Sequence, residues 1–211
     1  MKSFNEPGPT EHELIYLTAF AKEISDETYE IAKYILDDER FPKWSGSGHP
    51  HQHHYGYGGL MRHTYEVMEL CFMMKSGPYQ DHDIDPMELY LAVLFHDSGK
   101  MYDYERIPEE EICDPEDNFW RPTKHKRLIH HISRSAVMWT EASSPSARYF
   151  IKQSTRDNVL HAILAHHTKR EHGSPVAPKT RVAWLLTLCD NMSARMDDAD
   201  TWDIIKRPQT F

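Results

Sequence analysis

The chain has 211 residues and a hydrophobic fraction of 39%, so its length fits one large domain or a domain plus an appendage with a sizeable core. Its formal net charge of −9 argues against a broad surface that coats nucleic acid, and its longest apolar run, Leu89–Phe95, is too short to span a membrane. The N-terminus has no apolar signal core and the three cysteines form no C-x-x-C, so we expect reduced thiols in a cytoplasmic protein without a membrane partner.

Two helices are predicted at the N-terminal end. Thr10 with Glu13 forms a capping box before a helix over 11–22, and Ser25 can begin a second helix over 26–36. Neither helix carries a cluster of catalytic or metal-binding residue types, so we interpret both as a flap or a packing layer.

The next stretch, 41–58, is rich in Gly, Pro and Ser and is predicted to be irregular. It holds four of the chain's 15 histidines, which is typical either of a solvated loop or of a loop folded over a metal or phosphate site. Apolar residues at helical spacing follow over 60–74, and His63 lies on that stripe. A single histidine there is more often a hydrogen-bonded core residue than a ligand.

The run Leu89–Phe95 has no polar face, so as a helix it would be buried on all sides. Asp85 can cap its start, Pro86 suits the first helical position, and Glu88 completes a capping box. Burying a carboxylate and a cation costs several kcal/mol or more unless partners compensate for it. The polar residues that end the run are His96, Asp97 and Lys100. A metal ion with a bound anion would compensate all three. A second His-Asp pair, at 82–83, lies in a polar turn, and we assign it no catalytic or metal-binding role.

The second half of the chain is predicted as an acidic irregular excursion over 101–122, with room for a hairpin, and then three helices over 124–139, 156–168 and 180–196. In the first of these helices the inward residues are expected to be Leu128, Ile129, Ile132, Ala136 and Val137. No alternating strand pattern of any length occurs, so the fold class is all-α.

Five helices therefore bring imidazoles or carboxylates to an inward face or its end. They are His63, His96 with Asp97, His131, His166 with His167, and Asp190. This mixed set suits a divalent transition metal such as Mn, Fe, Ni, Co or Zn, with Mg also compatible, and the absence of thiolates argues against a structural zinc site. Asp97 would bridge two ions if two are present, and one or two ions both remain open.

The order H…HD…H…HH…D resembles the HD superfamily of metal-dependent phosphohydrolases, a helical bundle with a metal site at its centre. A finer resemblance, to the HD domain of YhaM-type 3′-to-5′ exoribonucleases, rests on HHYGYGGLMRH (53–63), LFHDSGK (94–100), HIS (131–133), HHTKREHGSPVAP (166–178) and DNMSARM (190–196). We therefore expect an N-terminal helical extension and loop over 1–49, an HD domain over 50–197 and a tail over 198–211.

The resemblance implies two ligand groups. His63, His96, Asp97 and Asp190 would hold one metal, and His131, His166 and His167 would complete a second site. His53 and His54 would lie on the substrate side, and Lys100 would meet a phosphate. The sequence departs from the family at Thr168, Val182 and Ser193, none of them a ligand. YhaM-type enzymes also carry an OB domain for single strands, whereas the residues before the match are predicted to be helical.

The expected chemistry is hydrolysis at phosphorus by metal-activated water. The residues given catalytic roles are Asp97, Lys100, His131 and His167, with His131 or His167 protonating the leaving oxygen. The residues given substrate-binding roles are His53, His54, Arg62, Lys100 and Lys169.

The predicted substrate is a nucleotide-type phosphoester: a nucleotide, or a cyclic or short oligonucleotide. The alternatives are a 3′-to-5′ exonuclease on single-stranded RNA or DNA, a deoxynucleoside triphosphohydrolase, and a non-catalytic nucleotide-binding module. The tail can dock on the domain or on a second copy, which leaves a homo-oligomer open.

Overall fold

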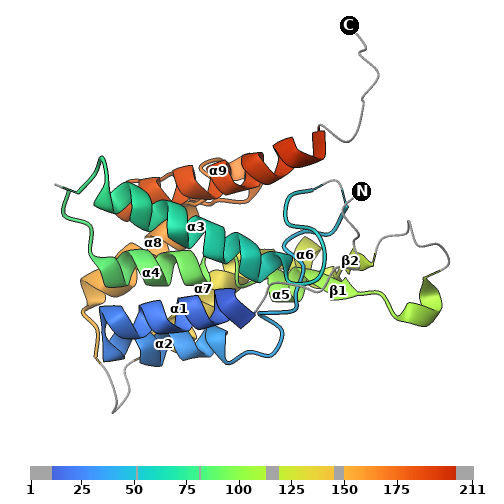
Figure 1. Ribbon diagram of the computed structural model, residues 1–211, viewed down its shortest axis with the longest axis horizontal. Coiled ribbons are helices and arrows are strands. Elements are labelled where there is room, and N and C mark those ends of the chain that lie inside the picture. Colours follow the sequence, from blue (N-terminus) through green and yellow to red (C-terminus); the bar gives the residue numbers. More distant parts are fainter. Residues whose placement is uncertain (1–10, 51, 81, 113–118, 145–149, 203–211) are drawn as a thin grey trace, which may run out of the picture.

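The computed structural model describes residues 11–50, 52–80, 82–112, 119–144 and 150–202, with side chains through residue 197. These residues form a bundle of helices with one small antiparallel hairpin extending from its end (Figure 1). The predicted all-α fold is confirmed. Thr10 and Cys113 lie outside the described residues, as does the tail beyond residue 202, while Cys71 and Cys189 are buried and free.

The longest connection between consecutive described helices is the irregular segment between Leu36 and Gly59. The helices are α1 (Glu11–Ile24), α2 (Asp26–Leu36), α3 (Gly59–Ser76), α4 (Pro86–Phe95), α5 (Lys100–Asp103), α6 (Lys124–Leu128), α7 (His131–Ala142), α8 (Gln153–Ala165) and α9 (Arg181–Trp202). Single 3-10 turns occur at Glu109–Glu111 and Arg170–His172. Strands β1 (Tyr104–Arg106) and β2 (Trp120–Pro122) pair within the acidic segment 101–122, where the sequence allows a hairpin.

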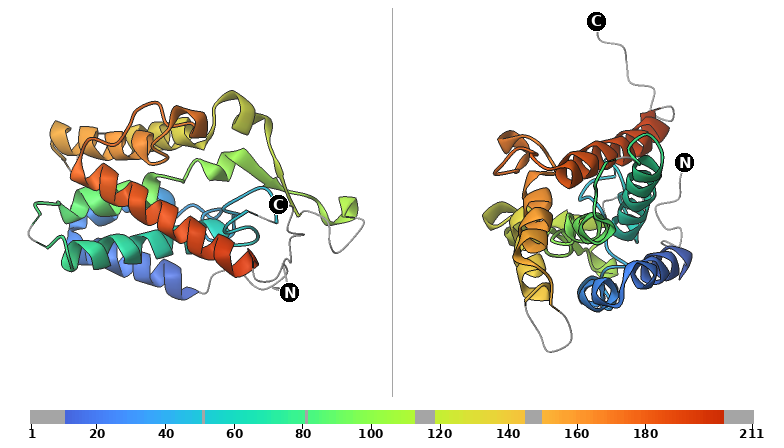
Figure 2. Two further views of the ribbon diagram at one scale, coloured as in Figure 1. Left: turned by 90° about the horizontal axis from the view of Figure 1, so that it is seen from above. Right: turned by 90° about the vertical axis from the view of Figure 1, so that its left-hand side faces the viewer.

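Helix α4 is the centre of the bundle. It packs against α1, α2, α3, α7, α8 and α9, which surround it in the end-on view of Figure 2. Every side chain of Leu89–Phe95 is buried, as the lack of a polar face predicts. The Asp85 carboxylate accepts the backbone N–H groups of Met87 and Glu88, which satisfies two of the helix's free donors.

One part of the predicted capping box is wrong. The Glu88 carboxylate accepts a hydrogen bond from the side-chain amide of Asn158 on α8 instead of reaching back to the start of its own helix. A hydrogen bond to Asn158 on another helix therefore replaces the expected bond between Glu88 and the backbone at the start of α4.

The single helix predicted over 124–139 is also wrong, because the chain breaks between α6 and α7. His130 has a φ of 69°, in the left-handed region, and the His131 N–H at the start of α7 donates to the Asp103 carboxylate over 3.0 Å. Since the break turns α6 away from the core, the side chains of Leu128 and Ile129 are exposed and not inward as predicted. The inward prediction is also wrong for Val137 on α7, whose side chain is 44% exposed. Ile132 is buried, and Ala136 packs against the core, as predicted.

The irregular loop over 41–58 is held closely against the start of α3. The Gly46 N–H donates to the His54 carbonyl over 2.9 Å, and the Leu60 N–H donates to the Trp44 carbonyl over 3.0 Å. A Cβ on Gly59 would lie 1.9 Å from the His54 oxygen, so only glycine fits at that position. The loop is therefore a packed lid over one end of α3 rather than a solvated tract.

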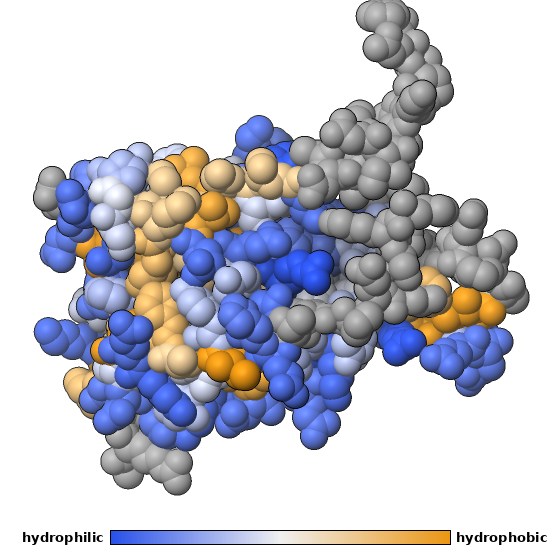
Figure 3. Space-filling view, viewed as in Figure 1, coloured by the Kyte–Doolittle hydropathy of each residue, from blue (hydrophilic) through white to orange (hydrophobic). Residues whose placement is uncertain are grey.

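The surface contrasts with the apolar interior. In Figure 3, hydrophilic residues cover much of the described face, interrupted by a narrower band of hydrophobic ones. Within the described residues, no helix combines the length and the hydrophobicity that crossing a membrane requires.

Candidate metal centre

The centre lies where the buried helix α4 ends. The side chains of His96, Asp97 and Lys100 follow α4 directly, and all three residues are buried. Helix α3 brings His63 to them, and α9 brings Asp190. The packing of α3 and α9 against α4 therefore brings together residues that lie far apart in the sequence.

A first set of four donors is formed by His63, His96, Asp97 and Asp190. Each residue offers one ligand atom, and these atoms all lie within 4.8 Å of one another. His63 Nε2 lies 3.1 Å from Asp190 Oδ1 and 3.4 Å from Asp97 Oδ2, and His96 Nε2 lies 3.4 Å from that same Asp97 oxygen. The spacing suits a single ion surrounded by two imidazoles and two carboxylates.

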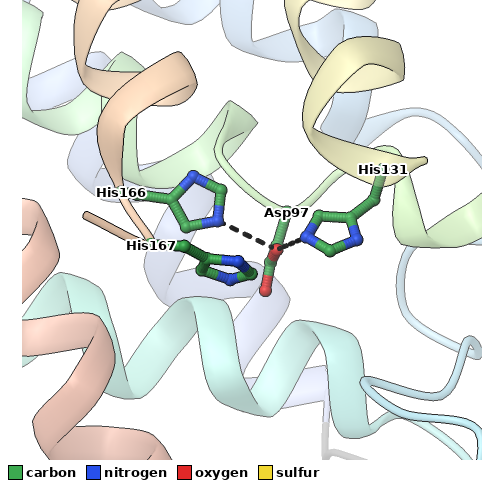
Figure 4. Close-up of side chains that lie close together, drawn as sticks. All are labelled: Asp97, His131, His166 and His167. Carbon is green, nitrogen blue, oxygen red and sulfur yellow. Dashed lines mark ion pairs between the residues drawn. The ribbon is translucent and has the colours of Figure 1, made fainter. Parts of the chain in front are cut away.

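A second set shares Asp97 with the first. In Figure 4 the imidazoles of His131, His166 and His167 surround the Asp97 carboxylate, coming from the start of α7 and the end of α8. Asp97 Oδ1 lies 3.4 Å from His131 Nε2 and 3.6 Å from His166 Nε2. Because Oδ2 faces the first set and Oδ1 the second, Asp97 is placed to bridge two ions.

Local backbone contacts orient two of the imidazoles. His96 Nδ1 lies 2.7 Å from the Val93 carbonyl, and His166 Nδ1 lies 2.7 Å from the Ile163 carbonyl, each three residues earlier on its helix. A carbonyl accepts only, so Nδ1 carries the proton and the Nε2 lone pair is directed at the centre. This is the arrangement that metal-ligating histidines ordinarily show.

Contacts with residues outside the same helix orient two more. His131 Nδ1 lies 3.1 Å from an oxygen of Asp103, a fully buried carboxylate. His167 Nδ1 lies 2.7 Å from the His172 carbonyl, in the turn that follows α8. Both rings thus present Nε2 to the second donor set.

The donor sets fit a divalent metal because three of their buried atoms have no hydrogen-bond partner among the described residues. These atoms are Asp97 Oδ1, His131 Nε2 and His166 Nε2. An unpaired buried polar atom costs about 1–3 kcal/mol, and more if it is charged. A cation that accepts lone pairs from all three would remove that cost.

The charges of the centre compensate one another. Burial acts to raise the pKa of Asp97, but Lys100, with Nζ 2.7 Å from Oδ2, and His96 outweigh it and hold that pKa well below its usual range. Burial acts to lower the pKa of His63, but Asp190 and Asp97 raise it to about 9. The two carboxylates therefore favour a positive charge between them, which either a proton on His63 or a metal ion supplies. Burial lowers the pKa of His131 to about 4, which leaves its ring neutral at pH 7.

A cavity of about 240 Å³ opens beside the centre. Its lining residues are His53, Lys100, His167, His172, Asp190, Asn191, Ala194 and Arg195. Three residues predicted to bind substrate lie elsewhere: Arg62 and Lys169 are exposed and do not line the cavity, and the buried His54 donates to Glu66. His53 and Lys100 line the cavity, and the substrate-binding roles of all five residues stay predictions.

Several residues of the site were not singled out from the sequence. Asn191, Ala194 and Arg195 follow Asp190 by one, four and five positions, which places them on the same side of α9, so helical spacing contained that signal. Asp103 and His172 had no comparable local signal, because their roles depend on contacts with His131 and His167.

Comparison with known proteins agrees with this geometry. The sequence model of the HD domain family matches residues 60–195, and the chain belongs to that family. This confirms the expected superfamily and covers every predicted metal ligand.

Among curated proteins the chain is similar to the 3′-5′ exoribonuclease YhaM of Bacillus subtilis strain 168, at 31% identity over 149 residues, which cover 70% of this chain and 42% of the relative. It is also similar to the YhaM proteins of Bacillus velezensis, at 31% identity (68% of this chain and 41% of the relative), and of Geobacillus sp. WCH70, at 27% (81% and 48%). The chain thus spans less than half the length of these relatives. No solved structure matched it.

Proposed function

We propose that this protein is a metal-dependent phosphohydrolase that cleaves a phosphoester or phosphodiester bond of a nucleotide-type substrate. The observation that carries the proposal is Asp97, whose two oxygens face two sets of mostly buried donors beside a cavity lined by cationic side chains. The family membership and the relatives' printed activity support the same class of reaction.

Bound divalent ions would supply an acidified water and positive charge beside the phosphoryl oxygens. Lys100 stays charged, because Asp97, Tyr104 and Asp190 outweigh the opposing effect of burial and raise its pKa. Its ammonium contacts the Asp97 carboxylate and would also contact the phosphate of a substrate bound in the cavity. One preorganised contact of this kind contributes roughly 10²–10³ in rate.

The proton for the leaving oxygen comes from the solvent-facing side of the cavity. Burial and the neighbouring His166 and His131 lower the pKa of His167 to about 3, so His167 is suited to ligation rather than to proton donation. We assign the proton donor to His172, an exposed imidazole on the cavity wall. His172 also orients His167 through its backbone carbonyl.

The cavity favours recognition of phosphate and sugar over recognition of the base. Lys100 and Arg195 provide cations, and none of the described lining residues is a Phe, Tyr or Trp on which a base would stack. The substrate's base would then lie outside, so we expect turnover that varies little with base identity. A 3′-terminal nucleotide of single-stranded RNA fits this description, and it is the alternative that the relatives favour.

An assay panel with Mn²⁺ tests the proposal. Progressive shortening of a short 5′-labelled RNA, with release of unlabelled mononucleotides, would indicate a 3′-to-5′ exonuclease. Cleavage of nucleotides or of cyclic or short oligonucleotides would indicate the phosphoesterase, and triphosphate released from dNTPs would indicate a triphosphohydrolase. Asp97→Ala is the control and should abolish every activity together with metal content. Metal-loaded protein that binds nucleotides but turns none over would indicate a regulatory module and overturn the proposal.

We extend the proposal to the setting of the protein. The free thiols of Cys71 and Cys189 suit the reducing cytoplasm. Residues 50–197 would form the catalytic domain, with α1 and α2 as a covering extension and 198–211 as a tail. Mn²⁺ is the first ion to test, since imidazole and carboxylate donors accept several divalent metals.

A further inference from the structure

A chain of hydrogen bonds runs from the metal centre through Ser193 on α9 to Glu66 on α3. His63 Nδ1 lies 3.2 Å from Ser193 Oγ on α9, and that hydroxyl lies 2.9 Å from Glu66 Oε2, one helical turn along α3 from His63. His63 is 0% exposed and Ser193 is 2% exposed, so water does not readily replace the contact between them.

The chemistry of the chain fixes the direction of each hydrogen bond. Burial acts to raise the pKa of Glu66, but His54, Ser193 and His63 outweigh it and lower that pKa, so the carboxylate is ionised and only accepts. Ser193 therefore donates its single hydroxyl proton to Glu66 and accepts from His63 Nδ1–H. His63 is left with its Nε2 directed at Asp97 and Asp190.

The same Glu66 oxygen holds the loop at the edge of the cavity. His54 Nε2 donates to Glu66 Oε2 over 2.8 Å, and the His54 backbone N–H donates to Asp197 over 2.6 Å. His54 adopts a φ of 54°, a conformation that needs such support in a non-glycine residue. Its neighbour His53 lines the cavity.

We propose that Glu66 and Ser193 are positioning residues: Ser193 orients the ligand His63, and Glu66 couples that ligand to the loop that carries His53. The proposal rests on the metal centre proposed above. It gives His54, which was expected on the substrate side and does not line the cavity, a role as a hydrogen-bond partner of Glu66. It also gives a role to Ser193, one of the positions at which the chain departs from the family pattern.

Metal affinity tests the role of Ser193 without any assay of activity. Mn²⁺ is titrated into metal-free protein by calorimetry for the wild type, Ser193→Ala and Thr187→Val. Thr187 provides the matched control, because its buried hydroxyl lies on the same helix and has no hydrogen-bond partner among the described residues. We expect Ser193→Ala to bind Mn²⁺ about 10–100-fold more weakly and Thr187→Val to bind as the wild type does. Equal affinity in all three proteins would overturn the role of Ser193.

Hydrogen exchange of the metal-free protein tests the role of Glu66. In Glu66→Ala, amides within 45–58 should exchange faster and Mn²⁺ affinity should also fall. In Ser193→Ala, loop exchange should stay at the wild-type rate, because the bond between His54 and Glu66 remains. Unchanged loop exchange in Glu66→Ala would overturn the coupling. Thermal unfolding of each metal-free variant verifies that it folds, and none of these readouts depends on the substrate or the reaction.

Discussion

Replacing Lys100 by Met should separate metal binding from catalysis. Lys100 Nζ lies 2.7 Å from Asp97 Oδ2, the same oxygen that faces the first donor set, so the ammonium and a metal ion both compensate one buried carboxylate. Removing one partner of a buried ion pair costs about 3–5 kcal/mol. The metal-free variant should lose about that much free energy of unfolding, while Met retains the apolar part of the side chain.

The loss should be much smaller when metal is bound, because the ion then compensates Asp97. If binding recovers about 3 kcal/mol, the thermodynamic cycle requires Lys100→Met to bind metal about 100-fold more tightly than the wild type. Turnover should nevertheless fall by roughly 10²–10³, since the cavity loses its buried cation.

Urea denaturation with and without Mn²⁺, together with direct Mn²⁺ titration, measures both sides of the cycle. The reasoning is refuted if Lys100→Met loses the same stability in both states, or if it binds Mn²⁺ more weakly than the wild type.

Three further predictions follow from the site. Asp190 and Asp97 outweigh the effect of burial and raise the pKa of His63 to about 9, so below that pH a metal ion must displace a proton from His63. Mn²⁺ affinity should therefore rise by up to about tenfold per pH unit until pH 9. An affinity that calorimetry finds constant from about pH 7 to 9 would contradict this. A Cβ on Gly99 would lie 2.2 Å from the His131 carbonyl, so Gly99→Ala should cost about 1–3 kcal/mol in urea denaturation and weaken Mn²⁺ binding; wild-type values of both would count against the packing argument. His172→Gln should lower kcat by about 10² or more while Mn²⁺ stoichiometry is unchanged, and a wild-type kcat would remove His172 as the proton donor.

The sequence predicted most of the helices because their signals are local. The run Leu89–Phe95 has no polar face, and Asp85 with Pro86 marks its start, so α4 and its burial follow from the residues themselves. The polar residues that end such a run need compensating partners, so Asp97 is predicted to lie beside a cation.

The break between α6 and α7 had no such signal. It depends on the Asp103 carboxylate, which comes from a distant segment and accepts the His131 N–H and ring N–H groups. The helical spacing of apolar residues over 124–139 continues across the break, so the sequence pattern predicted a single helix.

The same distinction applies to the site. The candidate ligands can be predicted from the sequence because several helices each carry a polar residue on an inward face, and the structure brings these residues together in two donor sets. The residues that contact His131 and His63, Asp103 and Ser193, come from other segments and lie beside those imidazoles only after folding. Sequence spacing therefore predicts which groups converge, and coordinates are needed to identify what holds them.

The central claim is that separate helices converge on a divalent metal through the shared carboxylate of Asp97. Titration of metal-free wild type and of Asp97→Asn with Mn²⁺, read by calorimetry and verified by elemental analysis, tests it most directly. The account predicts one or two bound ions per chain in the wild type and almost none in Asp97→Asn, because both donor sets lose their anionic ligand. Wild-type protein that binds no Mn²⁺, Zn²⁺, Fe²⁺, Co²⁺ or Ni²⁺, or a folded Asp97→Asn that binds as much metal as the wild type, would contradict it.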